Sequence, residues 1–182
     1  MTAPDTSEIE DAFLLQLGRT LAKWQWVEQA SYDLYVHMMK GADKHLISVT
    51  WHHIQSFDTR LGLLNSCAHF AVREDFRPDW KNLRGRLEKA SKTRNSIVHS
   101  VFGVRVDDGI GAAYLTTSHF DSTAIVRGKV NKNELRPEFI FDLARLARHM
   151  GEFEALSRKV LWFRALAFGL SHSEKNGAHK RP

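Results

Sequence analysis

The sequence predicts a mainly helical fold: a four-helix bundle of long helices, with a small β-hairpin inserted between the third and fourth helices. Apolar residues recur at helical spacing over long stretches. The 182 residues include only four prolines and eleven glycines, which suits long helices. The chain is 43% hydrophobic and long enough to bury a core. We therefore expect a single domain over residues 1–182, with flexible tails at 1–6 and 171–182.

The first helix is expected to begin at Ser7, a capping residue, and to end near Gly41. The second is expected over residues 45–72, and the third over residues 78–100, with a proline in its first turn. The fourth is expected to run from about 137 to 168. The apolar stripe of the second helix consists of Ile47, Trp51, Ile54, Leu61 and Ala68.

Residues 101–133 have a different pattern, with short β-branched or aromatic runs. The runs "VFGVRV" and "AAYLTT" are separated by "DDGIG", and "TAIVRGKV" follows them. Such runs around a glycine-containing turn predict a β-hairpin with room for a third strand.

The composition excludes several kinds of site. Cys67 is the only cysteine, so neither an intrachain disulfide nor a thiolate zinc site is expected. The histidines lack partners at metal-ligand spacing, and there is no phosphate-binding glycine loop, so we expect neither a metal nor a cofactor. No signal peptide and no membrane-spanning apolar run is recognised, which predicts a cytoplasmic protein without a membrane partner.

Positive charge is concentrated in the third predicted helix. Between residues 81 and 94, Glu88 is the only acidic residue, and the local excess of positive charge equals the +5 of the whole chain. This pattern indicates a polyanion partner such as RNA, or otherwise a solvated helix face. The basic residues are Lys81, Arg84, Arg86, Lys89, Lys92 and Arg94.

The same helix ends in "SKTRNSIVHS", residues 91–100, which contains the candidate catalytic residues Arg94, Asn95 and His99. Asn95 and His99 are four residues apart and share a helix face. Arg94 falls on the apolar arc instead, although its side chain is long enough to extend round the helix towards Asn95 and His99. The candidate RNA-binding residues Lys81, Arg84 and Lys92 lie on the flank of Asn95 and His99. The apolar arc consists of Leu83, Leu87, Ala90, Ile97 and Val101.

Each of these residues also has a structural interpretation. A cation on a core stripe needs a partner, and Glu28 and Asp58 occupy stripe positions of the first and second helices. Arg94 would then be a structural residue that catalyses nothing. Likewise, a histidine in the last turn of a helix is favoured by the helix dipole.

At residues 94–99, late in the predicted third helix of the bundle, an arginine is followed by an asparagine, three further residues and a histidine. This pattern resembles the defining motif of the HEPN superfamily. The resemblance covers about residues 8–168. It implies a metal-independent ribonuclease, a common activity of toxins in toxin–antitoxin and other defence systems. It also implies a homodimer with two motifs facing one cleft, and an antitoxin protein as a further partner. Other members of the superfamily are inactive interaction modules.

The residue types suit RNA cleavage without a metal ion. His99 could remove the proton of the 2′-hydroxyl or protonate the leaving oxygen. Arg94 could hold phosphate oxygens, and Asn95 could orient His99 or bind the ribose or phosphate. The leading hypothesis is an endoribonuclease. The alternatives are a non-catalytic dimeric module with a structural Arg94, and a nucleic-acid-binding protein without turnover. A fourth helix that is apolar on more than one face also favours a homodimer.

Overall fold

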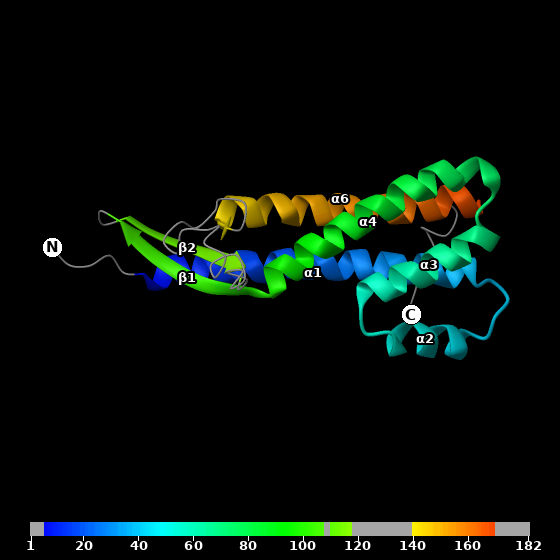
Figure 1. Cartoon of the computed structure of the whole chain (residues 1–182), viewed down its shortest axis with the longest axis horizontal. Coiled ribbons are helices and arrows are strands. Elements are labelled where there is room, and N and C mark those ends of the chain that lie inside the picture. Colours follow the sequence, from blue (N-terminus) through cyan, green and yellow to red (C-terminus); the bar gives the residue numbers. More distant parts are fainter. Residues whose placement is uncertain (1–5, 108–109, 118–139, 170–182) are drawn as a thin grey trace, which may run out of the picture. The chain divides into compact units, whose positions relative to one another are not determined.

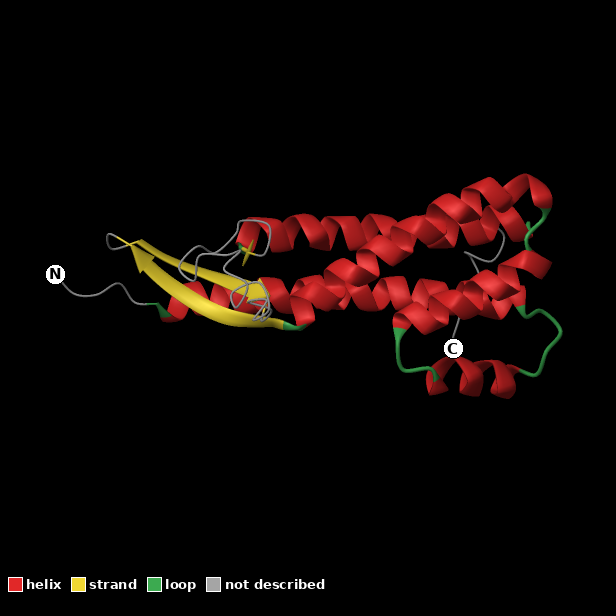
Figure 2. Cartoon of the chain, in the orientation of Figure 1, coloured by secondary structure: helices red, strands yellow, loops and turns green. Residues whose placement is uncertain are grey.

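The computed structural model describes residues 6–107, 110–117 and 140–169. It confirms a mainly helical fold with one small sheet, drawn in Figures 1 and 2. The described residues form five α-helices, whereas the sequence predicted four. In chain order the elements are α1 (Ser7–Met38), α2 (Lys44–His53), α3 (Phe57–Ala71), the 3-10 helix η1 (Glu74–Phe76), α4 (Arg77–Val98), β1 (Ser100–Asp107), β2 (Ile110–Thr117), β3 (Ile140–Phe141) and α6 (Leu143–Phe168).

The single second helix predicted over residues 45–72 is wrong, because α2 ends at His53 and α3 begins at Phe57. Ile54 has an extended backbone, with φ −80° and ψ 115°. Two residues later, Ser56 caps α3 by accepting a hydrogen bond from the backbone N–H of Thr59 at 3.1 Å. The cap satisfies a backbone donor at the start of α3, which stabilises a new helix start at this point.

The first helix ends close to where the sequence places it. α1 ends at Met38, and Gly41 follows in the turn with φ +96°. Residues with a side chain rarely adopt this left-handed conformation, so a glycine is suited to the position.

The sheet has the strand order β1-β2-β3, and both strand pairs are antiparallel. β1 and β2 contain the predicted runs "VFGVRV" and "AAYLTT", whereas the run at 123–130 lies outside the described residues. β3 replaces the predicted start of the fourth helix. α6 begins only at Leu143, where Asp142 accepts a hydrogen bond from the backbone N–H of Arg145 at 2.7 Å.

The described chain divides into two compact units. The first consists of Met1–Trp24 and Lys92–Phe153, and the second of Gln25–Ser91 and Glu154–Pro182. In the first unit, side chains from α1, α4, the sheet and α6 form one apolar cluster. Its buried members are Phe13, Ile97, Ala113, Leu115, Phe141 and Leu146.

Aromatic and aliphatic side chains fill the second unit. Trp51 stacks on Tyr35 with ring centroids 5.3 Å apart, and Trp80 packs against Phe163 at 5.8 Å. Leu83 and Leu87 of α4 are buried in the same unit, as their predicted apolar arc requires. The buried face of α4 therefore leaves the predicted basic flank exposed to solvent.

Candidate functional site

The three candidate catalytic residues lie at the C-terminal end of α4, in the first unit. Arg94 and Asn95 belong to the last turns of the helix. His99 lies just after Val98, in the turn that leads into β1, and is exposed. Its backbone N–H donates to the carbonyl of Asn95 at 3.0 Å. This bond extends the helical pattern by one residue and fixes the backbone of His99 one turn beyond Asn95.

The change from helix to strand also corrects one member of the predicted apolar arc. Val101 was expected on the helical stripe with Ile97. It lies in β1 instead, and its side chain is 54% exposed, whereas Ile97 is 2% exposed. The buried apolar face of α4 therefore ends at Ile97, and His99 lies in the exposed turn that follows the helix.

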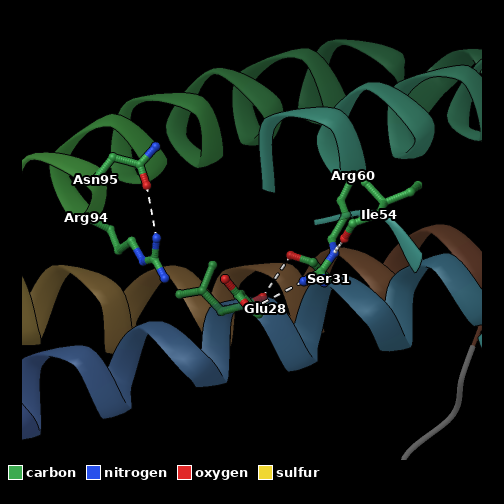
Figure 3. Close-up of polar contacts among 7 residues, drawn as sticks. Glu28, Ser31, Ile54, Arg60, Arg94 and Asn95 are labelled. Carbon is green, nitrogen blue, oxygen red and sulfur yellow. Dashed lines mark hydrogen bonds and ion pairs between the residues drawn. The ribbon is translucent and has the colours of Figure 1, made fainter. Parts of the chain in front are cut away.

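Arg94 reaches round the helix to Asn95, as Figure 3 shows. Its Nη1 donates a hydrogen bond to Oδ1 of Asn95 at 3.1 Å, although successive helical positions point about 100° apart. The Nε atom of Arg94 is buried and makes no hydrogen bond to the described residues. The guanidinium is therefore oriented by a neutral amide, which itself carries no charge to offset that of the arginine.

Asn95 links the other two residues. Its side chain accepts from Arg94, and its backbone carbonyl accepts from His99. The first bond holds the Arg94 guanidinium, whereas the second is an ordinary helical backbone bond that does not place the imidazole of His99. Arginine is a residue type that can bind phosphate oxygens, and histidine is one that can transfer protons.

The predicted RNA-binding residues are all exposed, but they belong to different units. Lys92 lies in the first unit with the candidate catalytic residues, and Lys81 and Arg84 lie in the second. Arg84 donates from Nη1 to Oδ1 of Asn65 on α3, at 3.4 Å. Asn65 was not predicted as a partner of Arg84, because an asparagine on a polar helix face gives no sign of which tertiary partner it meets.

The proposed acidic partners of Arg94 have partners of their own in the second unit. Glu28 forms an ion pair with Arg60 at 3.5 Å, and the two side chains are 20% and 15% exposed (Figure 3). Oδ1 of Asp58 accepts from the buried hydroxyl of Ser91 at 2.8 Å. An ion pair of Arg94 with either acid stays a prediction.

Arg60 is a structural residue that the helical pattern of the sequence did not predict. Its Nε donates to the carbonyl of Ile54 at 2.8 Å (Figure 3). Its guanidinium lies over the ring of Trp51, 5.5 Å from the ring centroid. Because residues 45–72 were predicted as one helix, the carbonyl of Ile54 was expected to bond within the backbone. The break at this position leaves that carbonyl for a side chain.

Within the described parts of the chain, no group of three or more histidine, cysteine, aspartate or glutamate residues could hold a metal ion. No helix in those parts is long and apolar enough to span a membrane. Comparison of the chain with protein-family models, with curated proteins and with solved structures finds no match.

Proposed function

We propose that the protein is a HEPN-type helical bundle that cleaves RNA as a metal-independent endoribonuclease in the cytoplasm. The observation that supports this most strongly is that the neutral amide of Asn95 holds the guanidinium of Arg94, with the exposed His99 one turn further along a basic helix. The resemblance of the motif to that of the HEPN superfamily points to the same activity. A role as a toxin, held in check by an antitoxin protein, belongs to this proposal.

In the proposed reaction, a histidine removes the proton from a ribose 2′-hydroxyl. The resulting oxygen attacks the adjacent phosphorus, and the bond from phosphorus to the 5′-oxygen breaks. The leaving 5′-oxygen takes up a proton, so the products carry a 2′,3′-cyclic phosphate and a 5′-hydroxyl. Arg94 would bind the non-bridging oxygens as negative charge develops on them.

The reaction needs both a base and an acid, and one chain supplies one histidine in this motif. A homodimer would bring a second His99 to the cleft, so that one imidazole accepts a proton while the other donates. It would also bring two basic helix flanks to the same RNA, including Lys81, Arg84 and Lys92 of each copy.

A specific observation favours the alternative of a non-catalytic interaction module. The buried Nε of Arg94 is typical of an arginine that is part of the packed structure. In this alternative Arg94 supports the end of α4, and Glu28 or Asp58 serves as its ion-pair partner. Such a protein would fold and dimerise but leave RNA intact.

The test is to incubate total RNA with the protein in EDTA, beside His99→Ala and His53→Ala. His53 is the matched control, because it is also an exposed histidine at the end of a helix. We expect wild type and His53→Ala to cleave equally, and His99→Ala to be at least ~100-fold slower. Equal cleavage by the two variants, or no cleavage by the folded wild type, would refute the nuclease proposal. Salt-sensitive binding that survives loss of His99 without cleavage would support nucleic-acid binding without turnover.

A further inference from the structure

Asn65 accepts two hydrogen bonds at a single oxygen in the second unit. Trp80 donates to Oδ1 of Asn65 from Nε1 at 3.2 Å, and Arg84 donates to the same oxygen from Nη1 at 3.4 Å. The indole that provides the first bond is rigidly placed, because Trp80 is 6% exposed and packs on Phe163. The buried tryptophan thus fixes the amide, and the amide in turn orients an exposed arginine.

The acceptor of Arg84 differs in charge from those of Arg158 and Arg164 in this unit. Arg164 pairs with Asp33 at 3.8 Å, and Arg158 with Glu154 at 3.7 Å, so carboxylates offset these charges. The amide of Asn65 orients the guanidinium of Arg84 without offsetting its charge. A guanidinium has five N–H donors in a fixed plane, so one bond to Asn65 leaves others for an anion.

We propose that Asn65 is a positioning residue that presents Arg84 to a phosphate of the RNA backbone; this rests on the proposed function. Lys81 precedes Arg84 by three residues, so the two share a flank of the helix. Because Arg84 is already oriented, it loses less conformational freedom when it binds an anion. The neutral acceptor gives this orientation while it keeps the attraction to phosphate at full strength.

The decisive variant is Asn65→Asp in the full-length chain. Aspartate has nearly the same shape and can accept from both Trp80 and Arg84, but its negative charge offsets that of Arg84. Binding is measured by fluorescence anisotropy with fluorescein-labelled 2′-O-methyl RNA, which lacks the attacking hydroxyl. The salt concentration is varied from ~50 to ~200 mM, because the salt slope reports the number of phosphate contacts.

We expect Asn65→Asp to weaken RNA binding severalfold and to lower the slope of log K against log salt concentration by about one. We expect the same two effects from Arg84→Gln. The glutamine variant lies at an exposed position and leaves the Trp80–Asn65 bond in place. Arg84→Gln therefore tests the phosphate contact even if the change at Asn65 lowers the stability of the fold. If Asn65 only supported the fold, Asn65→Asp would leave the slope unchanged.

Arg86 and Asn82 provide the matched control. Arg86 donates from Nε to Oδ1 of Asn82 at 3.0 Å, and it lies about 200° round the helix from Arg84. Asn82→Asp adds the same charge beside an arginine on the other flank, and we expect little change in binding.

Three outcomes would overturn the proposal, each in a different way. Equal weakening by Asn65→Asp and Asn82→Asp would reveal a general charge effect. An altered slope in Arg84→Gln with an unaltered slope in Asn65→Asp would keep the RNA contact but exclude the positioning role. An unaltered slope in both would remove Arg84 from the RNA surface, while the cleavage test with His99→Ala would still decide the nuclease proposal.

Discussion

Arg60→Met is expected to lower the free energy of unfolding by about 3 kcal/mol, because three contacts of the guanidinium are lost together. The hydrogen bond to the carbonyl of Ile54 at 2.8 Å involves a charged donor, and such bonds contribute ~1.5–3 kcal/mol. The position over Trp51 at 5.5 Å adds ~0.5–1 kcal/mol. The third loss leaves the carboxylate of Glu28, 20% exposed, without this cation. Methionine retains much of the apolar volume.

The measurement is urea-induced unfolding followed by far-UV circular dichroism, analysed with the linear dependence of the free energy on urea. Glu28→Gln alone should cost ~1 kcal/mol, and the double variant should cost less than the sum of the two single changes. Arg158→Met is the control, because its ion pair with Glu154 is formed by a side chain that is 71% exposed. We expect it to change the stability by less than ~0.5 kcal/mol. A loss below ~0.5 kcal/mol in Arg60→Met would refute the reasoning.

Urea unfolding of single and double variants also separates the structural and the catalytic interpretation of Arg94. Combining Arg94→Met with Glu28→Gln, and separately with Asp58→Asn, measures the coupling that the structural alternative requires. A coupling energy above ~1 kcal/mol with either acid would support that alternative. Additive effects would leave the charge of Arg94 for another partner, as the nuclease proposal requires.

Three further predictions follow from the described contacts. Ser56→Ala should cost ~1 kcal/mol by removing the cap of α3, seen as a lower urea midpoint, whereas exposed Ser66→Ala should change it little. Leu115→Ala should cost ~3 kcal/mol because this side chain is 3% exposed in the core of the first unit, and Val101→Ala, at 54% exposed, should cost less than ~1 kcal/mol. Burial raises the pKa of the Cys67 thiol above 9.0, so iodoacetamide at mildly alkaline pH should react faster with the urea-unfolded chain than with the folded one, and equal rates would contradict this. Because the raised pKa favours the neutral thiol in the folded chain, the stability that this thiol contributes is fully present below pH 9.0. It is lost as the pH rises through the folded-state pKa.

The sequence was sufficient to predict helices where one apolar period extends without interruption. It located α1 closely, and it identified the buried face of α4 through Leu83, Leu87 and Ile97. The stripe of the predicted second helix also includes buried residues such as Trp51 and Leu61, yet the helix is broken between them. Apolar spacing could not reveal the break, whereas the capping residue Ser56 was a local signal of it.

A similar ambiguity affects the two ends of the sheet. Phe141 is 3% exposed and so occupies an apolar position, but it lies in β3, where two residues pair with β2. Val101 fits a helical period from Ile97 and lies in β1. Short apolar runs fit both a helix and a strand, and tertiary pairing decides between them. Asp142, which caps α6, was the overlooked signal for the start of that helix.

The residues of the candidate site stay a prediction from the sequence, and the structure adds contacts among them that the sequence could not predict. The motif identified Arg94, Asn95 and His99, and helical spacing placed Asn95 and His99 on one face. The bond from Arg94 to Asn95 depends on the length and rotamer of an arginine side chain, which a helical wheel does not represent. The bond from Arg84 to Asn65 joins two separate helices, so it depends on their packing.

The central claim is that His99, Arg94 and Asn95 promote attack by a ribose 2′-hydroxyl. The most direct measurement is to map the product ends of a defined RNA cleaved in EDTA, beside the same RNA with a single 2′-deoxyribose 5′ to the scissile phosphate. We predict 2′,3′-cyclic phosphate and 5′-hydroxyl ends, with cleavage lost at the deoxy position. Products with 3′-hydroxyl and 5′-phosphate ends, or undiminished cleavage at the deoxy position, would contradict the claim.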